Sequence, residues 1–169
     1  MKDKTDEFKF YTELKVRYEE TDAMSVVYYG KYFVFFEVAR TEYLKNIGYK
    51  YTDIEKEGFY FVVAESNCKY FNPAKYDDDL KIYTKIEYIK NSSFNFIYKI
   101  VRENKTENPP KDGGYPITSK LKQTLPSTYT EHTDIASGYT VLVCVDNVDF
   151  KPKRIPEYLR KAIKDFEKY

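Results

Sequence analysis

The sequence has no tryptophan, only two cysteines, one histidine and no long apolar run. Its apolar runs reach about six residues, as in Phe59 to Ala64, whereas a helix needs about 20 to cross a bilayer. We therefore expect no membrane span. Cys68 and Cys144 have no second ligand at metal spacing, and a reducing compartment disfavours a disulfide, so we interpret both as packed thiols. The single histidine, His132, argues against a histidine-based triad or metal site, and we interpret it as a solvated loop residue.

A charge excess of either sign is also absent. Lys plus Arg is 28 and Asp plus Glu is 27, a formal net charge of +1. No overall field would attract nucleic acid or an anionic membrane, so we expect neither as a partner. The first residues, Met1 to Glu7, are polar and lack the apolar core of a signal peptide, which predicts a cytoplasmic protein. Glycine-rich phosphate loops, HExxH and GxSxG are missing as well.

Aromatic residues are abundant, with 19 tyrosines and 12 phenylalanines in 169 residues. In several stretches apolar and polar side chains alternate with the period of a half-buried strand. The stretch from Leu80 to Tyr88 and that from Phe94 to Ile100 are joined by a short polar turn, which predicts an antiparallel hairpin. The predicted strands are Phe8 to Tyr18, Phe59 to Tyr70, the two strands of this hairpin, and Tyr139 to Val145.

A helical rhythm interrupts the strands between residues 32 and 47. Tyr32, Phe36, Ala39 and Tyr43 follow the spacing i, i+4, i+7, i+11, and Gly48 follows as a stop signal. Apolar residues cover most of the circumference, which predicts a buried helix. A short C-terminal helix is expected from about residue 156. The fold class is therefore α+β, one domain over residues 1–169, with an antiparallel sheet wrapped around one long buried helix.

One stretch, residues 104–133, breaks the pattern with several prolines and glycines. Its length of about 30 residues is unusual for a connection inside a compact domain, so we interpret it as an irregular insertion. Two roles stay open. The insertion either packs as a surface loop on its own subunit, or it lies over a binding pocket and helps to select the substrate.

An acidic corner, Glu19 to Asp22, lies where the first strand ends and the chain turns toward the buried helix. Spacing alone favours a turn or capping carboxylate. The alternative is chemical: free N–H groups at the helix N-terminus polarise a carbonyl, while a carboxylate opposite attacks it or activates water. Acyl transfer would then need neither histidine nor serine.

The residues around this corner resemble a known family. The segment Arg17–Tyr32, followed by Phe36–Arg40, closely resembles the signature of the 4-hydroxybenzoyl-CoA thioesterase family of hotdog-fold proteins. Residues Tyr70–Asp78 are similar to that family's second landmark, and Ala136–Asp146 with Arg154–Pro156 to its last strand and ending. The resemblance covers nearly the whole chain except the insertion.

The resemblance implies an acyl-CoA thioesterase that cleaves an acyl- or aryl-CoA thioester without metal or cofactor. Asp22 takes the place of the catalytic carboxylate, as nucleophile or as general base. Tyr29 falls where the family presents a backbone N–H to the thioester carbonyl. Tyr32 and Lys90 are the implied substrate contacts, Lys90 through the phosphates of coenzyme A.

Two positions depart from the family pattern, and two other functions stay open. Ser25 replaces a usual glycine, which matters if the position needs a positive φ, and Lys31 replaces a common asparagine. A homodimer or homotetramer is implied, and the open edge of a small sheet also favours pairing with a second copy. The alternatives are a thioesterase acting on acyl carrier protein and a hotdog module that binds acyl-CoA without turnover.

Overall fold

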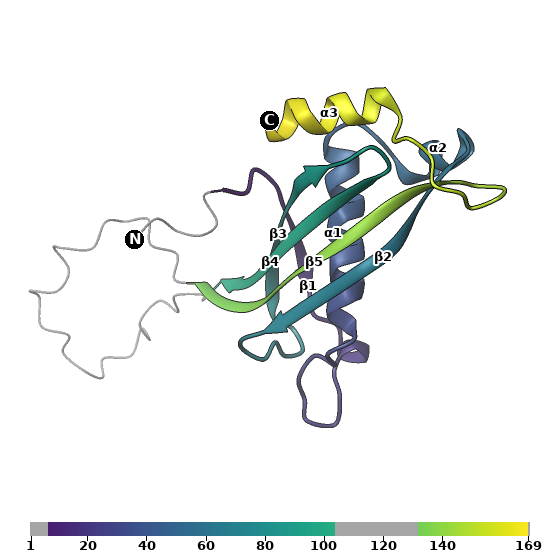
Figure 1. Ribbon diagram of the computed structural model, residues 1–169. Coiled ribbons are helices and arrows are strands. Elements are labelled where there is room, and N and C mark those ends of the chain that lie inside the picture. Colours follow the sequence, from purple (N-terminus) through teal and green to yellow (C-terminus); the bar gives the residue numbers. More distant parts are fainter. Residues whose placement is uncertain (1–6, 104–131, 169) are drawn as a thin grey trace, which may run out of the picture.

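A computed structural model describes residues 7–103 and 132–168 of the chain. An antiparallel sheet curves around one long helix, as predicted (Figure 1). The sheet order is β1-β3-β4-β5-β2, and every neighbouring pair is antiparallel. The strands are β1 (Tyr11–Lys15), β2 (Phe59–Tyr70), β3 (Asp79–Ile89), β4 (Ser93–Glu103) and β5 (His132–Asp146). The helices are α1 (Lys31–Asn46), α2 (Tyr51–Lys56) and α3 (Glu157–Glu167).

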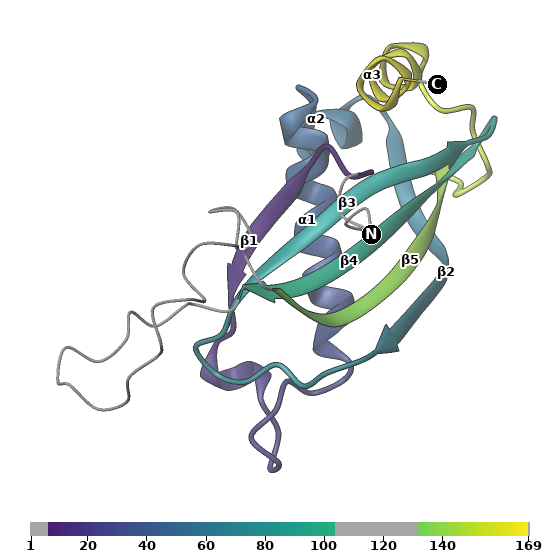
Figure 2. The same cartoon turned by 90° about the vertical axis from the view of Figure 1, so that its left-hand side faces the viewer.

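The helix α1 supplies the centre of the core. Its buried residues include Phe36, whose ring stacks on Tyr98 of β4 with centroids 4.3 Å apart and planes 9° from parallel. Gly48 follows the helix with a φ of +95°, a conformation that glycine adopts without strain, so the predicted stop is confirmed. Figure 2 shows the helix lying across the inner face of the sheet.

The opposite side of α1 corrects the prediction of a helix that is buried all round. Phe33, Val34 and Val38 are between 37% and 42% exposed. The sheet covers only one face, and apolar side chains on the other face remain in contact with solvent. An apolar composition around the whole helix therefore indicates a surface that a single copy of the fold does not cover.

The first strand is shorter than the predicted range of residues 8–18. After β1 the chain enters a short 3-10 turn, η1 (Tyr18–Glu20), and the Tyr18 side chain is 78% exposed. Glu20 is the buried residue here. Its carboxylate accepts hydrogen bonds from the Arg17 backbone N–H at 2.8 Å and from the Arg17 guanidinium at 2.8 and 3.1 Å. This pairing satisfies a buried charge and ends the strand early.

The bounds of β5 and of the two short helices also differ from the sequence prediction. His132, predicted as a solvated loop residue, is the first residue of β5, and its imidazole lies 3.5 Å from the Asp134 carboxylate. The rest of the predicted insertion, residues 104–131, lies outside the described part of the chain. The helix α2 had no sequence prediction, whereas α3 begins one residue after Pro156 and buries Leu159 and Ile163.

The strand β2 forms one edge of the sheet (Figure 2). It pairs with β5 on one side, from Phe59 opposite Asp146 to Tyr70 opposite Ala136. Its other side has no strand partner among the described residues, and the segment from Val62 to Asn67 is exposed. Within residues 7–103 and 132–168, no helix is both long enough and apolar enough to cross a membrane.

Candidate active site

Asp22 opens a tight turn before α1. Its backbone N–H donates to the Val26 carbonyl at 2.9 Å, and the Ser25 N–H donates to the Asp22 carbonyl at 2.9 Å. One carboxylate oxygen, Oδ1, accepts the Met24 N–H at 2.8 Å. The other oxygen, Oδ2, accepts no hydrogen bond from any residue that the structure describes. The carboxylate is thus held by the turn through one oxygen, and the second oxygen is available to a ligand.

Ser25 occupies the turn position where the family pattern has glycine. Its φ is 60°, in the left-handed region that glycine adopts most easily. The turn nevertheless closes through its backbone hydrogen bonds and the bridge between Thr21 and Val27. The replacement therefore adds backbone strain without preventing the turn.

The start of α1 presents an unused backbone donor. The Tyr28 N–H donates to the Glu20 carbonyl, and the Tyr28 carbonyl accepts the Lys31 N–H, both at 2.9 Å. The N–H of Tyr29, between them, donates to no acceptor in the described residues. Gly30, the N-cap residue, provides no side-chain cap. Free N–H groups at a helix N-terminus form a partially positive site for an anion or a polarised oxygen.

A pocket of about 310 Å³ joins these groups. Three of the four predicted site residues, Asp22, Tyr29 and Tyr32, line it. Tyr32 is 3% exposed, and burial raises its pKa, whereas the Tyr29 side chain is 62% exposed. The rest of the lining comes from the turn before α1 and from the end of β2 with the loop that follows: Met24, Val26, Val27, Tyr70, Phe71, Asn72 and Pro73.

Tyr70, at the end of β2, connects the two sides of the pocket. Its phenol donates a hydrogen bond to the Tyr29 carbonyl at 3.1 Å, and its ring meets the Tyr32 ring edge to face at 5.1 Å. Although the Tyr70 side chain is 44% exposed, partial desolvation of its phenol, with a smaller effect of the neighbouring Cys68 thiol, raises the pKa of Tyr70 to about 12. Tyr70 lies in the segment similar to the second family landmark, but no role was predicted for it. The only signal was its position just before the Pro73 turn.

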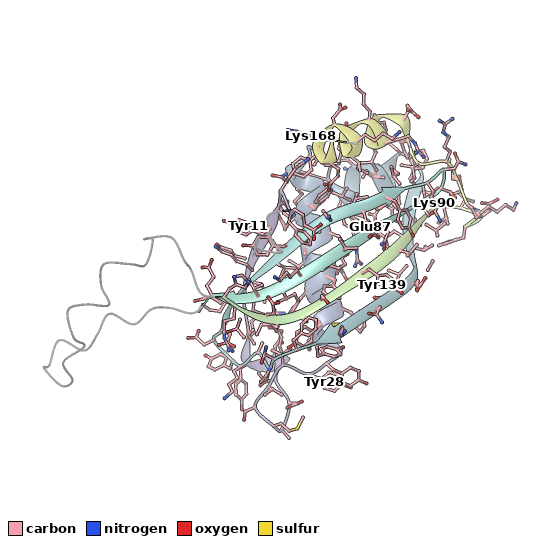
Figure 3. All side chains as sticks on the ribbon, turned by 60° about the vertical axis from the view of Figure 1, so that its left-hand side comes forward. Tyr11, Tyr28, Glu87, Lys90, Tyr139 and Lys168 are labelled. Carbon is pink, nitrogen blue, oxygen red and sulfur yellow. The ribbon has the colours of Figure 1, made fainter. Side chains whose placement is uncertain are left out.

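Lys90, the fourth predicted site residue, does not line this pocket. It follows β3 in the turn before β4, where its ammonium lies 5.0 Å from the Tyr88 ring centroid and its carbonyl accepts a hydrogen bond from Arg160. Figure 3 shows Lys90 at one end of the sheet and Tyr28, next to the pocket, at the other. Within one chain the structure therefore does not bring Lys90 to Asp22. No group of three His, Cys, Asp or Glu residues gathers in a metal-binding arrangement in the described ranges.

The sequence matches the family model described as the thioesterase-like superfamily over residues 16–163. The chain belongs to this superfamily. Among curated relatives, the putative acyl-CoA thioesterase YneP of Bacillus subtilis is 30% identical over 154 residues, covering 91% of this chain and 89% of the relative. The acyl-CoA thioester hydrolase YbgC of Escherichia coli is 30% identical over 148 residues, covering 88% and 90%.

Two solved structures share the fold of this chain. DHNA-CoA thioesterase from Staphylococcus aureus superposes with a TM-score of 0.70 at 28% identity, covering 94% of this chain and 88% of that one. A hypothetical protein from Thermus thermophilus gives a TM-score of 0.72 at 26% identity, covering 92% and 97%. The superfamily and these relatives confirm the predicted hotdog fold and the predicted enzyme class, thioester hydrolase.

Proposed function

We propose that this superfamily member hydrolyses an acyl-CoA thioester at the Asp22 pocket. The observation that carries the proposal is that one pocket is lined by both Asp22, whose Oδ2 accepts no hydrogen bond from the described residues, and Tyr29, whose N–H at the start of α1 donates none to them. One is a base or nucleophile, and the other is a donor for developing negative charge. The names of YneP and YbgC support the same substrate class.

The chemistry follows from these two groups. The thioester carbonyl oxygen accepts a hydrogen bond from the Tyr29 N–H, which stabilises the oxyanion that forms on attack. Asp22 either attacks the carbonyl carbon, giving an anhydride that water hydrolyses, or takes a proton from a water molecule that attacks directly. In both routes the C–S bond breaks, coenzyme A leaves as the thiol, and the acyl group is released as the free acid.

The lining of the pocket favours an aromatic acyl group. Tyr32, Tyr70 and Phe71 line the pocket together with Asp22. Aromatic rings favour edge-to-face and offset contacts with another ring, which discriminate an aryl group from a short alkyl chain. The similarity of the chain to the 4-hydroxybenzoyl-CoA thioesterase signature and to a DHNA-CoA thioesterase supports an aryl-CoA substrate. Tyr32 is then the wall of the acyl site.

A second copy of the chain is the partner that we propose for the β2 edge. Val62 and Val63 on this edge are 36% and 51% exposed, and the uncovered apolar side of α1 adds Phe33 and Val34. An unpaired strand edge with apolar neighbours is a template for pairing, and a two-fold pair is the commonest closed solution. The proposal therefore commits to an antiparallel β2–β2 contact in a homodimer, with a homotetramer as a further assembly.

This pairing would also give Lys90 a role. Phe59 pairs with Asp146, and the Cys144 N–H donates to the Ser92 carbonyl, so the Lys90 turn and the start of β2 share one end of the sheet. Antiparallel pairing places that end of one copy beside the Tyr70 end of the other. Lys90 of the partner subunit would then approach the Asp22 pocket and contact the phosphates of coenzyme A.

The dimer is tested by placing a charge on the β2 edge. Val63→Asp should give a monomer in light scattering, with activity lowered at least tenfold, because a carboxylate cannot be buried unpaired in a strand contact. Val148→Asp, at an 84% exposed position in the loop after β5, is the matched control and should stay dimeric and active. A Val63→Asp protein that remains a dimer would place the contact elsewhere.

The function itself is tested by a substrate panel. Aryl-, short-chain and long-chain acyl-CoAs are compared with the same acyl groups on acyl carrier protein and on N-acetylcysteamine, with the released thiol measured. We expect the highest kcat/KM with an aryl-CoA. A preference for carrier-bound substrates would favour the carrier-protein alternative, and tight acyl-CoA binding without thiol release would favour the binding module.

The cytoplasmic location stays a prediction.

A further inference from the structure

We propose that Tyr70 is a positioning residue for the reaction: its phenol fixes the backbone segment that carries the Tyr29 N–H. This inference rests on the proposed function, in which that N–H polarises the thioester carbonyl. Tyr70 itself need not touch the reacting atoms. It acts through the peptide backbone at the start of α1, from a strand that lies far from this loop in the sequence.

Among the described residues, the Tyr29 carbonyl accepts its one hydrogen bond from Tyr70. On the N-terminal side, the Tyr28 N–H and carbonyl are both bonded, to Glu20 and Lys31. On the C-terminal side, the Tyr29 carbonyl accepts the Tyr70 phenol. These bonds fix the orientation of the Tyr29 backbone from both sides, and a fixed donor loses no reorganisation energy when the oxyanion forms.

The Tyr29 side chain does not provide this anchoring. It is mostly exposed, and its ring contacts the neighbouring Tyr28 ring with centroids 4.5 Å apart. Tyr28 is also exposed, so the pair is not fixed against the core. The position of the loop therefore depends on its backbone contacts, among which the Tyr70 phenol is the side-chain donor contributed by another element.

Tyr70 is 44% exposed, but unlike the Tyr28–Tyr29 pair its ring packs edge to face on the buried Tyr32. The next residue, Phe71, donates its N–H to the Ile135 carbonyl at 2.9 Å. The Asn72 side chain donates to the Asp134 carbonyl at 2.7 Å, which ties the end of β2 to β5. With its raised pKa, the phenol keeps its proton across the neutral and moderately alkaline range and remains a donor.

Tyr70→Phe tests the inference, because it keeps the ring contact and removes only the hydrogen bond. We expect kcat to fall about tenfold while KM changes less than twofold. This fall in kcat is smaller than the ~10²- to 10³-fold loss when an oxyanion donor is removed altogether. Tyr158→Phe is the matched control. It removes a phenol of α3 that bonds Glu57, away from both the pocket and the β2 edge, and it should keep normal kinetics. An unchanged kcat in folded Tyr70→Phe overturns the inference.

A double-mutant cycle separates positioning from general stability. In a Tyr29→Pro background, which lacks the N–H, Tyr70→Phe should cause almost no further loss of kcat. A full tenfold loss in that background would show that Tyr70 acts by another route and would overturn the inference. Asp22→Asn distinguishes this failure from failure of the proposed function. If Asp22→Asn is inactive and Tyr70→Phe is normal, only the positioning role fails; if Asp22→Asn is fully active, the proposed function fails.

Discussion

At the scale of single residues, the Asp22 carboxylate is compatible with both roles that the sequence left as alternatives, a turn carboxylate and a catalytic carboxylate. Its Oδ1 accepts the Met24 N–H, as a turn-forming aspartate does, so the turn interpretation is confirmed. Its Oδ2 has no hydrogen-bond partner in the described residues, and Asp22 lines the pocket together with Tyr29. Spacing alone could not predict this, because the sequence does not show that one carboxylate oxygen is hydrogen-bonded in the turn while the other is not.

The role of Tyr29 leads to a prediction about its phenol. Because the proposed donor is the backbone N–H and the side chain is largely exposed, Tyr29→Phe should change kcat less than tenfold. Steady-state hydrolysis of the best panel substrate measures this. A collapse of turnover in Tyr29→Phe would assign the hydroxyl to the reaction and would remove the argument for a backbone donor.

Ser25 leads to a prediction about stability. A non-glycine residue at a φ of 60°, such as Ser25, is strained by roughly 1 to 2 kcal/mol. Glycine would relieve this strain, but part of the gain would be offset because glycine increases the conformational entropy of the unfolded chain. Ser25→Gly should therefore raise the free energy of unfolding by about 1 kcal/mol, measured by urea denaturation. Ser25→Ala keeps the strain and should give no gain. Equal stability of all three proteins would mean that the turn stores no strain.

At the scale of elements, the long helix and the central hairpin were predicted well. The predicted strand at residues 59–70 coincides with β2, and the hairpin residues lie within β3 and β4. These elements bury one face in the core, so their periodicity is strong. The errors fall where a specific contact overrides the pattern: the Arg17–Glu20 pair ends β1 early, and α2 is too short for a clear period. The order of the strands depends on long-range pairing and left no local signal.

The contact between α1 and the sheet depends on Gly138 in β5. A Cβ added there would lie 2.3 Å from the Asn67 carbonyl oxygen and 2.7 Å from the Phe36 ring. The backbone oxygen cannot move without shifting β2, so Gly138→Ala should destabilise the protein by about 2 to 3 kcal/mol. Ser137→Ala, one residue earlier, should change stability by less than about 0.5 kcal/mol. A Gly138→Ala protein as stable as the parent would show that β2 and β5 separate easily.

At the scale of the whole molecule, the described chain contains a pocket but not all of the predicted site. Asp22, Tyr29 and Tyr32 meet at one end of the sheet, and Lys90 lies at the other. Their separation was not predictable, because the order of the strands depends on long-range pairing that leaves no local pattern in the sequence. The proposed dimer would join the two ends across β2. The insertion and its two possible roles stay predictions, since residues 104–131 lie outside the described ranges.

The kinetics of Asp22→Asn test the central claim most directly. Asparagine keeps the size of the side chain and an oxygen for the Met24 N–H, but it removes the charge and the basicity that both hydrolytic routes require. Glu19→Gln, an exposed carboxylate in the same acidic corner, is the matched control and should keep normal activity. We predict that kcat for thioester hydrolysis falls ~10²-fold or more in Asp22→Asn, with unchanged circular dichroism and thermal unfolding. Near-normal turnover in a pure, folded Asp22→Asn protein would contradict the account.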